Sequence, residues 1–179
     1  MIRFSQAFLR PGFEREILSH LDAAFSLARF LLRDDQDAED AVQEASLRAF
    51  RFFDGFRGQN SRAWFLTIVR NSAYNILKHK HGHETDVAFD EQLHTPEPAP
   101  GSNVGSQLDS TLDRETIRSA IEQLVPEFRE VITLRELEDC SYKEIADIAG
   151  VPIGTVMSRL ARARTQLGEI LSKIYRGEK

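Results

Sequence analysis

The stretch SYKEIADIAGVPIGTVMSRLARAR, residues Ser141–Arg164, has the pattern of two short helices joined by a tight turn. Ile145 and Ala149 are apolar or small residues at helical spacing. Gly150 follows them, where a helix-ending turn favours a residue that is free to take a positive φ. Pro152 stands near the start of the next helix, where its missing N–H costs nothing. The pattern predicts a helix-turn-helix.

The second of these helices has a predicted buried stripe and a basic outer face. Apolar residues recur at steps of four, three and four, at Val156, Leu160, Ala163 and Leu167. Three arginines fall outside that stripe, at positions 159, 162 and 164. An ordinary helical hairpin with a solvated basic face would also fit any one of these features. Their combination favours a helix that enters a major groove of DNA.

Composition sets the class of protein. The chain has 179 residues, of which 41% are hydrophobic, enough for one large or two small domains. It contains no run of eighteen apolar residues, and residues 1–14 lack the apolar core of a signal peptide, so we expect a cytoplasmic protein without membrane insertion. Cys140 is the only cysteine, which excludes an intrachain disulfide and a cysteine-based zinc site.

Charge is distributed unevenly along the chain. The net charge of −5 is unusual for a protein that binds DNA. The net negative charge arises in residues 83–113, which hold seven acidic side chains and no lysine or arginine. Residues 57–82 hold five basic and no acidic side chains, and residues 151–179 hold six basic and two acidic ones. Two basic regions on either side of an acidic stretch indicate two nucleic-acid surfaces, each weak alone.

The first half of the chain reads as helices. Apolar positions at helical spacing predict a helix over residues 12–33, a polar turn over 34–37 and a second helix from about 37 to 53. The glycines of DGFRGQNS, residues 54–61, predict a loop, and Asn60 or Ser61 can cap the helix that follows. That helix extends to about residue 81. Its predicted outer face interleaves an aromatic with polar and basic side chains, an arrangement that suits single-stranded nucleic acid, at Arg70, Asn71, Tyr74 and Lys78.

Helical periodicity stops from residue 83 to about residue 110. The segment TPEPAPGSNVGS within it is rich in proline and glycine, which predicts a flexible acidic linker. A second helical unit begins near Leu112, and Pro126 opens a further helix that leads into the helix-turn-helix. No strand pattern of useful length occurs. The predicted fold class is therefore all-α, with two small helical domains over residues 1–82 and 112–179 and a linker over 83–111.

The whole chain resembles the extracytoplasmic-function sigma factors, which are initiation subunits of bacterial RNA polymerase. Three strings carry the resemblance in the expected order. DAEDAVQEASLRAF, Asp37–Phe50, resembles the polymerase-binding helix of the family, and DGFRGQNSRAWFLTIVRNSAYNIL, Asp54–Leu77, resembles the element that melts and reads the −10 promoter region. The string from Leu124 to Arg164 resembles the reader of the −35 element. The resemblance implies region 2 over residues 1–82 and region 4 over residues 112–179.

The resemblance also implies partners and contact residues. It implies that the coiled coil of the polymerase β′ subunit contacts Asp37, Asp40, Gln43 and Glu44. It implies that a flipped −10 base is held by the loop residues Phe56, Arg57, Gly58, Gln59 and Asn60. Trp64 either serves this melting surface or packs in the core against Phe65 and Ile68. The resemblance further implies contacts of Arg70, Asn71 and Lys78 with the −10 strand or its phosphates.

For the −35 element, the resemblance implies a phosphate contact from Arg135 and groove contacts from Pro152, Gly154, Thr155, Ser158, Arg159 and Arg162. The chain departs from the family at two places. The junction between the loop and the following helix is a residue shorter than in some relatives, which affects the assignments from Gln59 to Ala63. Met157 stands where relatives often carry a basic residue, and a methionine offers no hydrogen-bond donor to a guanine.

The function expected from the sequence is that of an initiation factor. It would bind the β′ and β subunits of core polymerase and promoter DNA, and the family implies an anti-sigma partner. It would be neither an enzyme nor dependent on a cofactor. One alternative is a stand-alone helix-turn-helix regulator that binds duplex DNA without polymerase. A nuclease is a second, but no metal-ligand cluster or nucleophile–base pair stands out. Lys78 and Lys80 argue against a metal site at the histidines of HKHGH, residues 79–83.

Overall fold

The structure is a computed structural model and describes residues 11–58, 60–80 and 114–177. Within those ranges every regular element is a helix, which confirms the predicted fold class. The predicted linker lies outside the described residues. The first unit comprises α1 (Pro11–Glu16), the short 3-10 segment η2 (Leu18–His20), α2 (Leu21–Leu32), α3 (Asp35–Phe52), η3 (Phe53–Gly55) and α4 (Ser61–Lys80). The second comprises α5 (Arg114–Glu122), α6 (Pro126–Ile132), the π-helical segment η6 (Thr133–Leu137), α7 (Tyr142–Ala149) and α8 (Ile153–Arg176).

Helices α2, α3 and α4 pack together around apolar side chains that their helical periodicity places on one side. Leu27 and Leu31 of α2, Val42 of α3, and Phe65 and Val69 of α4 are all fully buried. Polar residues at the helix starts fix where two of these helices begin. The carboxylate of Asp34 accepts a hydrogen bond from the Asp37 N–H at 2.9 Å, and the amide oxygen of Asn60 accepts one from the Ala63 N–H at 2.9 Å.

The start of the chain differs from the prediction. Residues 12–33 were expected to form one helix, but the structure divides them into α1, η2 and α2. The Phe13 ring lies edge-on to the rings of Phe50 and Phe53, with centroids 5.3 and 5.4 Å away. These contacts hold α1 against the end of α3, and Ile17 leaves regular helical geometry at φ −112°. The predicted polar turn is also shorter than expected, because α3 begins at Asp35 immediately after its cap.

The second unit contains the predicted helix-turn-helix. Ser141 and Glu144 form a reciprocal capping box at the start of α7, and Gly150 ends that helix in the left-handed region at φ 68°. Val156, Leu160 and Ala163 are buried along α8, as their spacing predicts. None of the helices in the described part of the chain combines the length and the apolar character that a membrane crossing requires.

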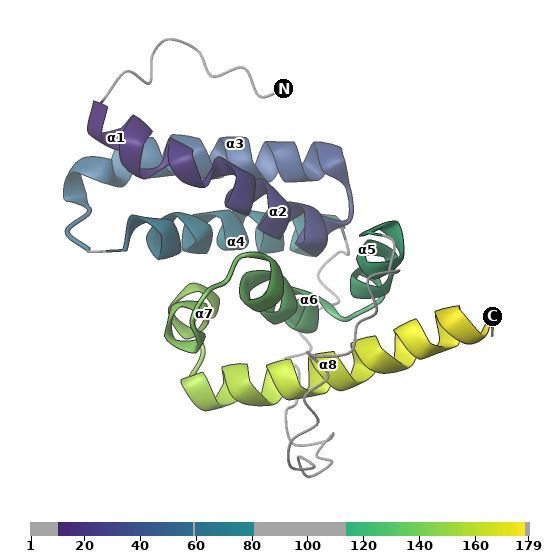
Figure 1. Cartoon of the computed structure of the whole chain (residues 1–179). Helices are drawn as coiled ribbons and strands as arrows, with labels where there is room; N and C mark the ends of the chain where they lie inside the picture. Colours follow the sequence, from purple (N-terminus) through teal and green to yellow (C-terminus); the bar gives the residue numbers. More distant parts are fainter. Residues whose placement is uncertain (1–10, 59, 81–113, 178–179) are drawn as a thin grey trace.

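The two units lie against each other. Helices α6 and α7 pack on the side of the first unit formed by α2 and α4, and α8 lies beyond them on the far side (Figure 1). Buried residues of both units belong to one continuous hydrophobic cluster. The arrangement therefore brings α4, which carries the predicted −10 residues, next to the helix-turn-helix.

Candidate functional surfaces

Helix α3 presents a row of side chains to solvent on the face opposite its buried stripe. Asp40 and Gln43 are exposed, and the structure gives neither a hydrogen bond nor an ion pair with another described residue. The other two predicted polymerase-binding residues are engaged within the first unit. Asp37 forms an ion pair with Lys80 and is 17% exposed, and Glu44 pairs with Arg48 at 2.5 Å.

Leu47 continues the row of Asp40 and Gln43 at a spacing of three and then four residues, and its side chain is 41% exposed. Sequence reasoning missed this residue. Its signal is the helical spacing, which places an apolar residue on the polar face of α3. The exposed row therefore ends in an apolar contact point beside an unpaired carboxylate.

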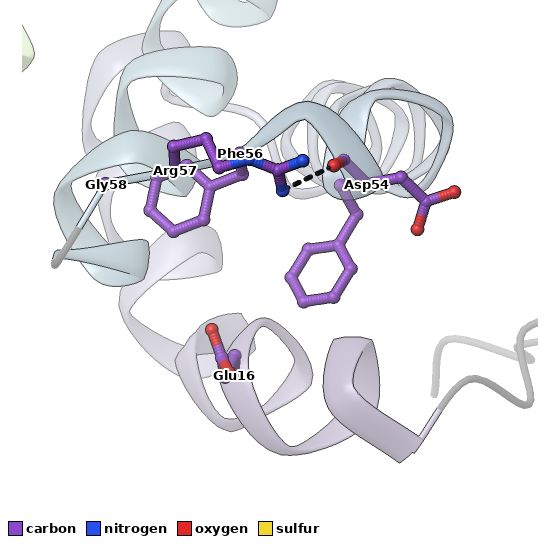
Figure 2. Close-up of a pocket in the computed structure, with 6 residues that line it drawn as sticks. Glu16, Asp54, Phe56, Arg57 and Gly58 are labelled. Atoms are coloured by element: carbon purple, nitrogen blue, oxygen red, sulfur yellow. Dashed lines mark hydrogen bonds between the residues drawn. The ribbon is translucent and has the colours of Figure 1, made fainter.

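The loop that follows α3 borders a shallow pocket of about 510 Å³ that is largely open to solvent. Glu16 of α1, Phe53 and Asp54 of η3, and the loop residues Phe56, Arg57 and Gly58 line it (Figure 2). Arg57 donates a hydrogen bond to the Asp54 carbonyl oxygen at 2.9 Å. Glu16 and Arg57 thus place one charge of each sign at the border of this space, while the Asp54 carboxylate points away from it (Figure 2).

An aromatic pair forms one wall of the loop. The Phe56 ring stacks on Trp64, with centroids 4.7 Å apart and planes inclined by 27°. A Cβ placed on Gly58 would lie 2.7 Å from the Phe56 ring, so glycine leaves the room that this ring occupies. Trp64 is half-buried and also packs on the core. Its side chain therefore contacts both the loop, through Phe56, and the core of the first unit, and these are the two environments expected for it. Gln59, the remaining loop residue of the prediction, lies outside the described residues.

The predicted −10 residues of α4 fall into two groups. Asn71 and Lys78 are exposed, although the Asn71 amide oxygen accepts a 3.3 Å hydrogen bond from Arg70. Arg70 itself lies at the contact between the units, where its Nε donates to the carboxylate of Glu130. Tyr74 differs from the prediction of an outward-facing aromatic. It is covered by the Arg70 guanidinium, 4.4 Å from its ring centroid, and burial raises its pKa.

Asn60 also reaches the second unit. Its amide nitrogen donates a hydrogen bond to Glu144 of the capping box at 2.7 Å. The backbone N–H and the hydroxyl of Ser141 hydrogen-bond the same carboxylate, and together these donors hold the pKa of Glu144 below its usual value. Arg62, which sequence reasoning did not single out, donates to the carbonyl oxygen of Glu138 at 2.7 Å and to its carboxylate at 3.1 Å.

The predicted −35 residues lie in η6 and at the start of α8. Pro152 caps α8 and is exposed together with Gly154, while Thr155 and Ser158 are half-buried. Arg135 donates to the Cys140 carbonyl oxygen at 2.9 Å and lies over the Tyr142 ring. Met157 is 53% exposed, so the departure from the family pattern stands on an accessible part of the helix.

The two arginines of this predicted surface are less accessible than their sequence position indicates. Both are half-buried, and Arg159 Nε and Arg162 Nη1 are buried atoms without a hydrogen-bond partner in the described part of the chain. Burial raises the pKa of the Glu130 carboxyl group, and the charge of nearby Arg159 acts in the opposite direction. Among the described residues, no group of three or more His, Cys, Asp or Glu side chains is placed to hold a metal ion.

Comparisons with known proteins agree on one family. Residues 17–82 match the family described as Sigma-70 region 2, and residues 114–167 match Sigma-70, region 4. The ECF RNA polymerase sigma-E factor of Escherichia coli K12 is 34% identical over 146 residues, 78% of this chain and 76% of that protein. SigE of Mycolicibacterium smegmatis is 30% identical over 165 residues, 91% of this chain, which spans 63% of that relative's length.

A solved structure is similar over both helical units. The sigma factor RpoE, crystallised with the anti-sigma factor NepR from Bartonella quintana, matches with a TM-score of 0.69 and 34% identity. The match covers 91% of this chain and 98% of that one. One domain alone would not reach such coverage, so the similarity extends to the way the two units are placed together.

Proposed function

Because the chain belongs to the extracytoplasmic-function sigma factors of bacterial RNA polymerase, we propose that it binds core polymerase and directs it to specific promoters. The proposal rests on the joint presence of an acidic helix, a loop with a pocket and a helix-turn-helix, in family order, in one chain. Residues 1–82 act as region 2, residues 83–111 as the linker and residues 112–179 as region 4. The protein contributes binding energy, and the polymerase carries out the chemistry.

Polymerase binding is assigned to α3. Asp40 and Gln43 offer an unpaired carboxylate and an amide on the exposed row, and Leu47 adds an apolar contact. Asp37 and Glu44 lie on the same half of the helix, but each already shares its charge with a cation of this chain. The β′ coiled coil is therefore expected to draw most of its electrostatic attraction from Asp40.

Reading of the −10 element is assigned to the loop and to α4. The shallow pocket beside Phe56 and Arg57 accepts a base extracted from the duplex. The exposed residues Asn71 and Lys78 contact the strand beside the flipped base. Extraction of a base costs a few kcal/mol, which stacking and pocket contacts must offset.

Reading of the −35 element is assigned to the helix-turn-helix. The N-terminal turns of α8 enter the major groove, where the exposed positions Pro152, Gly154 and Met157 meet DNA first. Met157 can contact a thymine methyl group but cannot donate to a guanine, so it shifts the base preference at its position. Arg159 and Arg162 contribute further groove contacts, and Arg135 supplies charge for the phosphates.

Regulation is assigned to an anti-sigma protein. The solved relative is held by one, and the similarity covers both helical units of this chain. A protein that binds these two units together would withhold the sigma factor from polymerase. The protein is placed in the cytoplasm, where its polymerase partner acts.

The test is run-off transcription with core polymerase on a library of genomic DNA, followed by sequencing of the 5′ ends. Addition of the protein should create transcripts that share sequence near −10 and −35. Arg162→Ala should reduce them, whereas Arg176→Ala, which removes the same charge from the exposed C-terminal end of α8, should not. Nanomolar, sequence-specific binding to duplex DNA without polymerase, combined with no transcripts, would instead identify a stand-alone regulator.

A further inference from the structure

A buried carboxylate connects the two helical units. Glu130 of α6 has a fully buried side chain, although it belongs to the second unit and its ligands belong to the first. One carboxylate oxygen accepts from Arg70 Nε, and the other accepts from the Tyr74 hydroxyl at 3.4 Å. Both ligands lie on α4, which packs beside α6 (Figure 1).

Arg159 approaches the same carboxylate from α8. Burial raises the pKa of Glu130, and the charges of Arg70 and Arg159 act in the opposite direction. Both carboxylate oxygens accept hydrogen bonds, and these donors offset part of the cost of burying the carboxylate. A single carboxylate therefore interacts with one arginine from the proposed −10 helix and one from the proposed −35 helix.

Further contacts join the two units around the edge of this interface. Asn60 of the first unit donates to Glu144 of the second, and Arg62 donates to Glu138. At the other end, Arg129 of α6 donates to the Leu31 carbonyl oxygen at the end of α2, at 3.1 Å. Carboxylates of the second unit thus accept hydrogen bonds from Asn60, Arg62 and Arg70 of the first unit. These donors lie on or beside the proposed DNA surface.

We propose that the free protein is held in a closed arrangement that excludes DNA, in which Glu130 occupies Arg70 of the proposed −10 helix and Arg159 of the proposed −35 helix at the same time. The inference rests on the proposed function, which identifies the DNA surfaces. The contact of Glu130 with Arg70 and Tyr74 does not depend on that function. DNA binding at α4 then requires that α6 move away, since Arg70 cannot serve a buried carboxylate and a DNA strand at once.

The consequence is a population effect. The apparent affinity for DNA is the intrinsic affinity multiplied by the open fraction, so a closed state that dominates by about a hundredfold lowers apparent affinity by about a hundredfold. A second consequence concerns partners. A partner protein that prefers the closed form binds more tightly when that form is more populated. Glu130 stabilises the closed form, so it increases the affinity of such a partner without contacting it.

Glu130→Gln in the full chain tests the proposal, because it removes the charge and keeps the shape. Glu136→Gln is the matched control: it removes the same charge from the neighbouring segment η6, where Glu136 pairs with Arg164 of its own unit at 2.6 Å. Small-angle scattering measures opening. A compact chain of this length has a radius of gyration of about 16 Å, and separation of the units should increase it by about 4 Å or more.

Anisotropy of a fluorescein-labelled single strand of about 20 nucleotides, of mixed sequence and at low salt, measures access to the DNA surface. We expect Glu130→Gln to increase the radius of gyration and to tighten binding by about tenfold or more, while Glu136→Gln changes neither. Glu138→Gln, which loses the carboxylate contact with Arg62 but keeps its carbonyl contact, should act in the same direction by about two- to threefold. This variant also serves if circular dichroism shows that Glu130→Gln does not fold.

Several results would overturn the proposal. A wild-type chain that is already extended in solution, or a Glu130→Gln variant with an unchanged radius, would refute the closed state. A variant that opens without gaining DNA affinity would refute the covering of the DNA surface. Transcription by the wild-type chain with core polymerase, measured in parallel, separates these failures from a failure of the proposed function, because the latter would abolish transcripts whatever the radius of gyration.

Discussion

Replacing Asp40 with asparagine should weaken binding to core RNA polymerase more than replacing Asp37 in the same way. Both carboxylates lie on the same half of α3, and the sequence alone does not rank them. The structure does, because Asp37 forms an ion pair with Lys80 and is largely covered, while Asp40 is exposed and has no ion-pair partner in the described ranges.

The size of the effect follows from the electrostatics of a partly desolvated contact. Opposite unit charges 4 Å apart attract by about 1 kcal/mol in water and by about 4 kcal/mol at the effective dielectric constant near a protein surface. Asp40 is exposed before binding and pays for desolvation on binding, so a net loss of about 1–2 kcal/mol is expected, which is about 5- to 30-fold in Kd. Asp37→Asn should cost about twofold or less, since Lys80 already offsets its charge.

The measurement is fluorescence anisotropy of the protein, labelled at its N-terminus and titrated with core polymerase. Asp22→Asn is the matched control, because Asp22 is an exposed aspartate of the same unit on a different helix, α2. Circular dichroism should show unchanged helicity in all three variants. The reasoning fails if Asp40→Asn binds as well as Asp22→Asn, or if Asp37→Asn loses more affinity than Asp40→Asn.

Three further predictions concern stability and promoter opening. Arg129 is 4% exposed and donates to three backbone carbonyl oxygens, so Arg129→Met should lower the free energy of unfolding by about 2–4 kcal/mol. The surface change Arg118→Met should lower it by less than about 1 kcal/mol. Urea denaturation measures both losses, and equal losses would contradict the prediction. Hydrogen bonds from Ser141 hold the pKa of Glu144 low, so the stabilising contribution of this carboxylate is present above the usual glutamate pKa and is lost as pH falls through the lowered pKa. As pH decreases from about 6 to 3, the melting temperature of Glu144→Gln should therefore fall less steeply than that of the wild-type chain. An identical slope would count against the capping box. Asn71→Ala should reduce permanganate reactivity of the −10 strand by about tenfold while polymerase still forms the closed complex, and a variant that opens promoters normally but fails to bind them would reverse this assignment.

Local patterns in the sequence were sufficient for the elements that local forces stabilise. The fold class, the helix-turn-helix with Gly150 at its turn, the cap at Asn60 and the buried stripe of α8 are all present in the structure. Each depends on residues within a few positions of one another, where helical periodicity and backbone conformational freedom act directly. The family resemblance rests on the same strings, and the comparisons agree with it.

Breaks and exposures that depend on distant residues were not predictable in this way. The division of residues 12–33 into three segments follows from the packing of Phe13 against Phe50 and Phe53, which are about forty positions away. The apolar periodicity of the segment is continuous, so it gives no sign of the break. The exposure of Leu47 was likewise not predictable from the sequence. It follows from the structure, in which the face of α3 that carries Asp40 and Gln43 is directed to solvent.

The sequence by itself determined that this chain has two helical units with basic regions and an acidic stretch of sequence between them, and that it resembles a sigma factor. Only the tertiary structure decided which of its charged residues are available to a partner. Glu130 stands among apolar residues of α6, and no local pattern distinguishes it from a surface glutamate. Its contact with Arg70, sixty positions away, arises because α6 and α7 pack on the side of the first unit formed by α2 and α4, which buries the Glu130 side chain completely. Periodicity predicts which face of a helix is buried, whereas the partner that covers an exposed face is determined by the packing of distant segments.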